Sequence, residues 1–251
     1  MLRTDGPPST TIAAVFVRVA GTGTLAGTPA PPARPYGPCL ELGSGASVSN
    51  GMRLDDLAIG LDTAPMEAKS ADRLPGDGGW QFEPKWDGFR CLAFRAGGTV
   101  ALMAKSGKPL TRFFPEVVER LRSLERDPFV VDGELMIKVA GAYAFDALQM
   151  RLHPAESRIR KLAAETPADL VLFDCLLSDN GDSLLAAPLT RRHAALKAFH
   201  AAAGRAEGLD LTPFTRDRGS PRTGSITSAP PWMAWSASGW AAPMRRASGR
   251  C

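Results

Sequence analysis

The sequence is poor in the residues that most often bind metals or form crosslinks. Its 251 residues include three histidines and four cysteines, and the cysteines are scattered at Cys39, Cys91, Cys175 and Cys251. No CxxC pair and no cysteine–histidine spacing matches a zinc site, so we expect no structural zinc. Isolated cysteines of this kind are typical of reduced thiols, which predicts a cytoplasmic protein.

Long apolar runs are also lacking. None reaches the roughly 18–20 residues that a membrane-spanning helix needs, so we expect no membrane partner. The stretch TIAAVFVRVAGTGTLAG has some character of a signal sequence, but Arg18 interrupts its apolar run. Met52 is an alternative start of translation.

Lysine is missing from both ends of the chain, since all seven lysines lie between Lys69 and Lys197. Residues 1–56 and 219–251 are rich in Ala, Gly, Pro, Ser, Thr and Arg, which is typical of disordered or low-complexity segments. The net charge is +1 for residues 1–51, −1 for 52–218 and +4 for 219–251. Any nucleic-acid contact of the middle must therefore be a local patch.

From residue 57 to residue 218 the apolar pattern is that of an organised domain. It predicts strands in 79–86, 89–98, 99–107, 128–139 and 168–177, and helices in 115–125, 144–152, 156–165 and 189–203. The strands follow one another mostly as hairpins, and strict βαβ alternation is lacking. The pattern predicts an α+β fold of antiparallel β-sheets flanked by helices.

The stretch FEPKWDGFR (residues 82–90) is the most informative for chemistry. It predicts a strand to Trp86, a turn at Asp87–Gly88 and a second strand from Phe89, with Lys85 beside the turn. Aromatic neighbours remove water from the lysine, and this disfavours the charged ammonium, as a nucleophilic lysine requires. A lone KxDG also occurs in ordinary hairpins, so these residues alone leave a structural role open.

The longer segment PMEAKSADRLPGDGGWQFEPKWDGFRCLAFR resembles the entry to the adenylation domain of small bacterial ATP-dependent DNA ligases. The resemblance continues in order through KSGKPLTRFFPEV, VVDGEL, FDALQMRLHPAESRIRKLAAETPADLVLFDCLL and PLTRRHAAL, over about residues 64–218. It implies the ATP-grasp-like nucleotidyltransferase fold, shared with RNA ligases and capping enzymes. It also implies ATP as substrate, with Mg²⁺ or Mn²⁺.

The resemblance implies a nucleotide-binding role for five of the matching residues. Lys85 would attack the α-phosphate of ATP and hold AMP as a phosphoramidate. Glu83 would lie near the adenine amino group, and Arg90 would contact the ribose or the nucleic acid. Glu134 would bind the metal or the ribose, and Phe173 would stack on adenine. Two of these residues have simpler explanations: Glu134 as an exposed edge residue, and Phe173 as part of the core.

The remaining matches support the motif or meet phosphate. Asp87 and Gly88 would complete the lysine motif. Lys105, where the family usually has arginine, and Arg112 would meet phosphate or nucleic acid; lysine keeps the charge but loses the bidentate geometry. Asp132 and Asp174 are assigned structural roles at strand ends.

The implied function is that of a monomeric DNA ligase (ATP) of the bacterial cytoplasm that seals nicked double-stranded DNA in repair or recombination. Two alternatives stay open. One is an RNA ligase or capping-type nucleotidyltransferase with the same lysine chemistry. The other is a non-catalytic remnant that binds nucleotide or nothing.

Two later lysine motifs of the family, an E/D-G-V-V-x-K strand and a KxK-type pair, are missing after residue 198. Because Trp and Met have single codons, the neighbouring reading frame of WMAWSASGW is constrained. That frame requires Asp-Gly, followed by Leu, Met or Val and then by Val or Glu. Two codons further on it permits Lys, followed by Arg. We therefore expect a frameshift near 218–223, with a natural disordered tail as the alternative.

The expected frameshift divides the chain into three parts. Residues 1–56 would be a low-complexity extension, 57–218 a C-terminally incomplete adenylation domain, and 219–251 an unfolded out-of-frame tail, without an OB-fold domain. Losing one charge-stabilising contact lowers a rate roughly a hundred- to thousandfold, so weak adenylation at most is expected.

Overall fold

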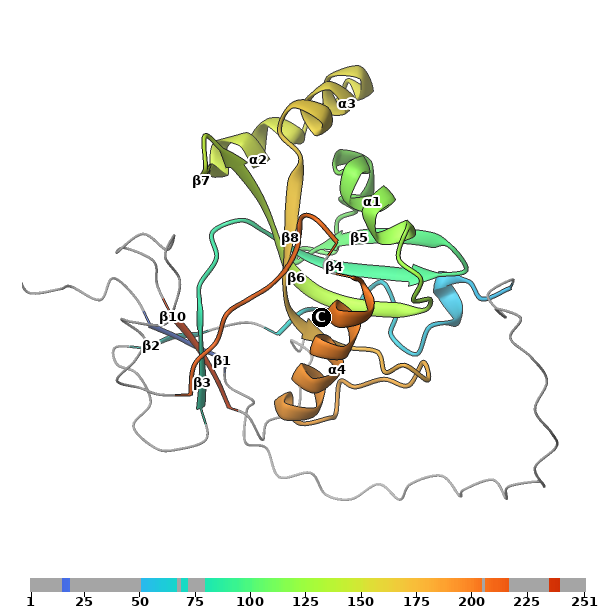
Figure 1. Ribbon diagram of the computed structural model, residues 1–251, viewed down its shortest axis with the longest axis vertical. Coiled ribbons are helices and arrows are strands. Elements are labelled where there is room, and N and C mark those ends of the chain that lie inside the picture. Colours follow the sequence, from blue (N-terminus) through green and yellow to red (C-terminus); the bar gives the residue numbers. More distant parts are fainter. Residues whose placement is uncertain are drawn as a thin grey trace, which may run out of the picture.

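The computed structural model describes residues 15–18, 51–66, 69–71, 80–204, 206–216 and 235–239, and describes side chains only within 51–66, 80–204 and 206–216. The described residues form two β-sheets and four α-helices (Figure 1). This arrangement confirms the α+β class that the sequence predicts.

The larger sheet has the strand order β5-β4-β6-β8-β9, with β7 paired to β6. Its strands are β4 (Phe89–Ala96), β5 (Thr99–Ala104), β6 (Phe129–Val139), β7 (Ala142–Tyr143), β8 (Ala168–Cys175) and β9 (Leu209–Leu211). Gly97 and Gly98 connect β4 to β5 with φ of 55° and 77°. Glycine adopts this left-handed conformation readily, so the hairpin forms where the sequence predicts it.

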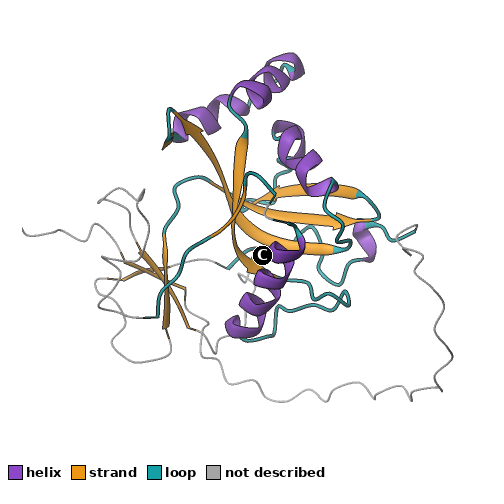
Figure 2. Cartoon of the chain, in the orientation of Figure 1, coloured by secondary structure: helices purple, strands orange, loops and turns teal. Residues whose placement is uncertain are grey.

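All four helices lie where the apolar spacing predicts them. They are α1 (Pro115–Arg122), α2 (Phe145–Arg151), α3 (Glu156–Glu165) and α4 (Leu189–Ala202), with short 3-10 helices η1 (Leu54–Asp56) and η2 (Thr111–Phe113). Leu121 of α1 and Phe199 of α4 belong to one buried cluster with Leu102 and Val131 of the sheet. In Figure 2, α2 and α3 lie together near β7. None of these described helices is long and apolar enough to cross a bilayer.

The other face of the large sheet is covered by the segment 54–66. Because side chains alternate along a strand, Leu92 and Phe94 point away from the helix-covered face. They pack against Ile59 and Met66 in a second apolar cluster. This packing fixes the end of the segment, residues 65–66, beside β4.

The predicted hairpin between residues 79–86 and 89–98 is wrong. β3 (Trp80–Pro84) belongs to the smaller sheet, with the order β2-β1-β10-β3. β4 is already paired on both sides, with β5 and with β6, so it has no free edge for β3. Pro84 ends β3, and residues 85–88 carry the chain from one sheet to the other.

The expectation of antiparallel sheets is wrong at two strand pairs. β8 pairs in parallel with β9, and β1 (Val15–Arg18) pairs in parallel with β10 (Trp235–Gly239). Between β8 and β9, helix α4 returns the chain to the starting end of the sheet, so the next strand runs in the same direction.

Three described elements lie in ranges for which we expect a low-complexity or disordered extension (1–56) and an unfolded tail (219–251): β1, η1 and β10. β10 pairs with β3 in antiparallel register from Trp235↔Pro84 to Gly239↔Trp80, and β1 pairs with β2 (Lys69–Ala71). Strand pairing uses main-chain N–H and C=O groups, so composition gives little warning of it. Most of both ranges lies outside the described residues.

Cys91 and Cys175 are buried in the large core. Burial raises the pKa of both thiols, and that of Cys175 reaches about 11. Because the thiolate is the reactive form, we expect neither residue to react with iodoacetamide at pH 8 in the folded protein. Both should react in denaturant. Peptide mass spectrometry checks this, and rapid native alkylation of either peptide contradicts the packing described above.

Candidate functional site

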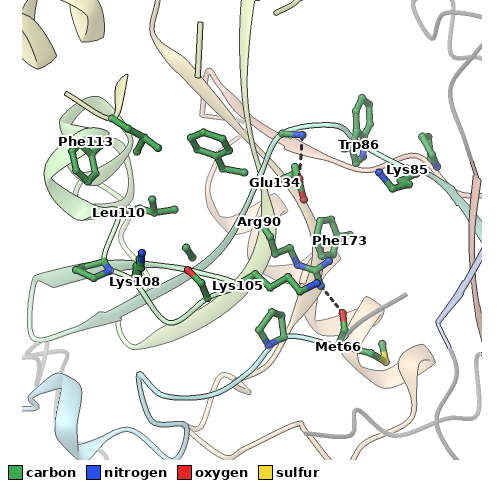
Figure 3. A pocket seen from close by; sticks show the side chains of 18 residues that line it. Met66, Lys85, Trp86, Arg90, Lys105, Lys108, Leu110, Phe113, Glu134 and Phe173 are labelled. Atoms are coloured by element: carbon green, nitrogen blue, oxygen red, sulfur yellow. Dashed lines mark hydrogen bonds between the residues drawn. The ribbon is translucent and has the colours of Figure 1, made fainter. Parts of the chain in front are cut away.

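A cavity of about 1080 Å³ opens between the chain crossing at 84–90, the loop after β5, and strands β6 and β8. Six of the predicted site residues line it: Lys85, Gly88, Arg90, Lys105, Glu134 and Phe173. Figure 3 shows Glu134, Arg90 and Phe173 near one another, with Lys85 and Lys105 on different sides of them. Side chains far apart in the sequence therefore share one cavity.

The crossing segment holds Lys85 at the cavity wall. Lys85 is half-buried and directly follows the end of β3 at Pro84. The neighbouring Trp86 is fixed by a hydrogen bond from its indole Nε1 to Thr212 Oγ1 (2.9 Å) and by edge-to-face contact with Tyr143, at 5.7 Å between ring centroids. Trp86 thus anchors the chain next to the lysine.

Gly88 and Glu134 lie against each other where the crossing passes over β6. The Gly88 N–H donates to Glu134 Oε1 at 3.2 Å. A Cβ on Gly88 would lie 2.3 Å from the Leu135 carbonyl oxygen and 2.9 Å from Glu134 Cγ, so only glycine fits this close approach. Glu134 sits on β6 between β4 and β8, so it is not an edge residue.

We expect Gly88→Ala to lower the free energy of unfolding by about 1–3 kcal/mol, because the added methyl group overlaps β6 backbone. The crossing must then move, which shifts Lys85 relative to Glu134. Gly51→Ala is the matched control, since a Cβ there meets nothing within 4 Å. Urea denaturation measures both. Equal midpoints for Gly88→Ala and the wild type contradict the close approach.

Arg90 has its guanidinium fixed on two sides. Its Nε and Nη2 donate to the two carboxylate oxygens of Asp132, each at 2.7 Å, and Nη2 also donates to the Met66 carbonyl oxygen at 3.4 Å. Its Cζ lies 4.2 Å from the centroid of the Phe173 ring. Burial opposes the charge, but attraction to Asp132, and less strongly to Glu134 and Asp174, raises the pKa of Arg90.

Phe173 is placed by an irregularity in β8. Asp132 pairs with Asp174 and Gly133 pairs with Leu172, so Phe173 is the extra residue of a β-bulge. Bulges commonly re-aim a side chain beside a functional site. Phe173 is buried, as the core explanation requires, but it also lines the cavity and stacks on Arg90.

The loop after β5 contributes two lysines. Lys105 and Lys108 both line the cavity and are exposed. The loop is tight because Ala104 N–H donates to the Lys108 carbonyl at 2.8 Å, and Gly107 has a φ of 74°. Sequence reasoning missed Lys108, although the KSGK spacing with its central glycine was a signal. It also missed Met66, which no local pattern marks.

Three predicted residues do not line this cavity. Because β3 ends at Pro84, the alternation that would put Glu83 and Lys85 on one face of the strand is broken. Glu83 is buried, accepts a hydrogen bond from Gln81 Nε2 at 2.7 Å and lies 3.6 Å from His193 Nε2. Asp87 is exposed on the crossing. Arg112 is exposed and donates to the Pro154 carbonyl oxygen at 2.8 Å. The contact of Glu83 with adenine, the contact of Arg112 with phosphate or nucleic acid, and the role of Asp87 in the lysine motif stay predictions.

Together, these groups make a site for an anionic, planar ligand, with an amine in its wall, cations around it and an aromatic ring held in place. A model of the ATP-dependent DNA ligase domain matches residues 65–209, which is more than half of the chain. The chain belongs to this family.

Curated proteins with similar sequences are named as DNA ligases. DNA ligase C2 of Mycolicibacterium smegmatis is 41% identical over 162 residues, which cover 64% of this chain and 44% of that protein. DNA ligase C of Mycobacterium tuberculosis is 43% identical over 158 residues, covering 61% of this chain and 43% of that protein. The chain thus spans less than half the length of these relatives.

Among solved structures, the ligase domain of M. tuberculosis LigD is 27% identical, with a TM-score of 0.43. The match covers 54% of this chain and 40% of that one. A mycobacterial DNA ligase D complexed with ATP and MES is 25% identical, covering 61% of this chain and 46% of that one, with a TM-score of 0.41.

Proposed function

We propose that this chain carries out the first step of ATP-dependent DNA ligation, in which Lys85 becomes adenylated. The observation that carries the proposal is the meeting of Lys85, Glu134 and Phe173 at one cavity. These residues come from the crossing segment, β6 and β8, so only the folded chain brings them together. The family to which the chain belongs supports ATP as the substrate.

The proposed reaction moves AMP onto the lysine amine. The unprotonated Nζ of Lys85 forms a P–N bond to the α-phosphorus of ATP, and the bond from that phosphorus to the β-phosphate oxygen breaks. Pyrophosphate leaves, and the proton displaced from Nζ passes to solvent. Phe173 offers a face for the adenine ring, while Arg90, Lys105 and Lys108 supply positive charge near the sugar and phosphates.

The cavity also fits a divalent cation. Mg²⁺ in nucleotide sites is commonly held by one or two carboxylates together with substrate phosphates and waters. Glu134 supplies one carboxylate at the cavity wall, and the described residues contain no cluster of three or more protein ligands. Glu134 would therefore hold Mg²⁺ or Mn²⁺ jointly with ATP, and the cation would neutralise charge on the phosphates.

In the complete reaction, AMP would pass from Lys85 to a 5′-phosphate at a nick in double-stranded DNA, and the 3′-hydroxyl would displace it. We place this activity in DNA repair or recombination in the bacterial cytoplasm, carried out by a monomer. The names of the relatives support DNA as the substrate.

The proposal is tested by incubating the full chain with α-labelled ATP and Mg²⁺, then adding nicked DNA or nicked RNA. We expect label on the protein and its transfer to DNA. Preferential transfer to nicked RNA favours an RNA ligase. A folded sample that binds ATP without acquiring label is a non-catalytic nucleotide-binding protein, and the proposed activity is then wrong.

We also propose that adenylation by this chain is impaired. If residues 219–251 are translated out of frame, the chain lacks the lysines of the two later family motifs, which would contact phosphate. Labelling should therefore be followed under single-turnover conditions with protein in excess. Sequencing the gene around codons 215–225 tests the argument. An uninterrupted frame there, with no ligase-like continuation in the adjacent frame, contradicts it.

A further inference from the structure

Four charged side chains run from the cavity wall into the protein interior. Arg90, at the cavity, is paired with both oxygens of Asp132. Asp132 is the register partner of Asp174 on β8, so the two carboxylates lie on one face of neighbouring strands. Arg192 of α4 donates from Nε to the two oxygens of Asp174, at 2.9 and 3.0 Å. Arg192 is 0% exposed and is not part of the cavity wall.

The two carboxylates compete for cations. Asp132 and Asp174 are each 1% exposed, so their mutual repulsion is weakly screened by water. Burial raises the pKa of Asp174, the charge of Arg192 opposes this rise, and the charge of Asp132 adds to it. Asp174 also attracts Arg90. Arg192 therefore satisfies the carboxylate that would otherwise be a second partner for Arg90.

The next residue of α4 holds the other side of the same wall. His193 Nε2 lies 3.1 Å from the Phe173 carbonyl oxygen, so this nitrogen donates to the carbonyl when it carries the ring proton. Gln81 Nε2 lies 3.1 Å from His193 Nε2 and 3.4 Å from its Nδ1. Consecutive residues of α4, Arg192 and His193, thus bind consecutive residues of the bulge, Asp174 and Phe173.

We propose that Arg192 is a positioning residue for the nucleotide: by occupying Asp174, it leaves Asp132 as the carboxylate that orients Arg90 against Phe173. The inference rests on the proposed function, since it assumes that the cavity takes ATP. A purely structural alternative exists, because Arg192 also donates to the Ala187 carbonyl oxygen at 2.7 Å and so ties α4 to the preceding loop. The two roles predict different effects of replacing Asp174 by asparagine in the Arg192→Met variant. Only the positioning role predicts that ATP affinity is restored.

Arg192→Met removes the guanidinium and keeps an unbranched apolar chain in place of the aliphatic part of the arginine. Asp174 is then left to compete for Arg90. We expect ATP affinity to fall about tenfold or more, which is the usual effect of losing one charge-assisted hydrogen bond. Arg192→Lys keeps the charge but not the two-oxygen contact, so we expect a smaller loss, about threefold. Adding Asp174→Asn to Arg192→Met removes the competitor, and affinity should return to within about threefold of wild type.

Arg191→Met is the matched control, since Arg191 is the exposed neighbour on the same helix. Calorimetry with a non-transferable ATP analogue and Mg²⁺ gives Kd for the full chain, and α-labelled ATP gives KM and the maximal rate of self-adenylation. The proposal predicts that Kd and KM change more than the maximal rate. Thermal melting verifies that each variant is folded. If Arg192→Met does not fold, Arg192→Lys, which keeps a cation at Asp174, still tests the proposal.

The result that overturns the proposal is an unchanged Kd in a folded Arg192→Met or Arg192→Lys variant, or a double variant that binds as weakly as Arg192→Met. A wild-type chain that binds the analogue but is never labelled refutes the proposed catalytic function alone, and the Kd series still decides the role of Arg192. A wild-type chain that does not bind the analogue refutes both.

Discussion

Replacing Lys85 by arginine is expected to abolish covalent labelling of the chain by α-labelled ATP, a fall of at least about a thousandfold. Arginine keeps a cation at the cavity wall, so ATP should still bind. Its guanidinium stays protonated near neutral pH and has no free electron pair with which to attack phosphorus. The expected loss is therefore in the chemical step.

Two measurements separate this explanation from unfolding or loss of binding. Kd for a non-transferable ATP analogue should change by less than about tenfold in Lys85→Arg, because charge is retained. Lys161→Arg is the matched control: Lys161 is exposed on α3 and forms an ion pair with Glu165 at 3.7 Å. Labelling of Lys85→Arg at the wild-type rate contradicts the assignment of Lys85 as nucleophile.

Glu134→Gln is expected to lower the rate of self-adenylation about a hundred- to thousandfold, the usual effect of removing one preorganised electrostatic contact. Glutamine has nearly the same size, and its amide oxygen still accepts the Gly88 N–H that Glu134 binds at 3.2 Å. The crossing segment should therefore keep its place. What is lost is the negative charge that would hold the divalent cation.

Loss of the Glu134 charge should also change how labelling depends on Mg²⁺. The Mg²⁺ concentration that gives half-maximal labelling should rise in Glu134→Gln, while the urea midpoint stays close to that of the wild type. Glu125→Gln, at an exposed position before β6, is the matched control. If the rate falls with no change in Mg²⁺ dependence, Glu134 acts through the ribose or through packing, and the metal role is wrong.

Local structure was largely predictable from the sequence. Helix α3 begins and ends at the predicted residues, and α1 begins at Pro115, because proline, first-turn acid and apolar spacing all act within one segment. Partner choice between strands was not predictable in the same way. Residues 80–84 and 89–96 both form strands, but whether they pair depends on the edges that β5 and β6 occupy.

The site was predicted in part. Lys85, Arg90, Lys105, Glu134 and Phe173 were found through the resemblance, and the structure gathers them at one cavity. The orientation of Glu83 depends on the break at Pro84, which ends the alternation that would have put both carboxylate and amine on one side. The packing of Met66 and the pairing of Arg192 depend on contacts between distant segments.

The most direct test of the central claim is to find which residue carries AMP. The full wild-type chain is incubated with ATP and Mg²⁺, digested, and its peptides are sequenced by tandem mass spectrometry under conditions that preserve phosphoramidates. We expect one AMP on the peptide that contains Lys85. An adduct on a different lysine, or no adduct in a folded sample that binds ATP, contradicts the assignment of Lys85 as the nucleophile.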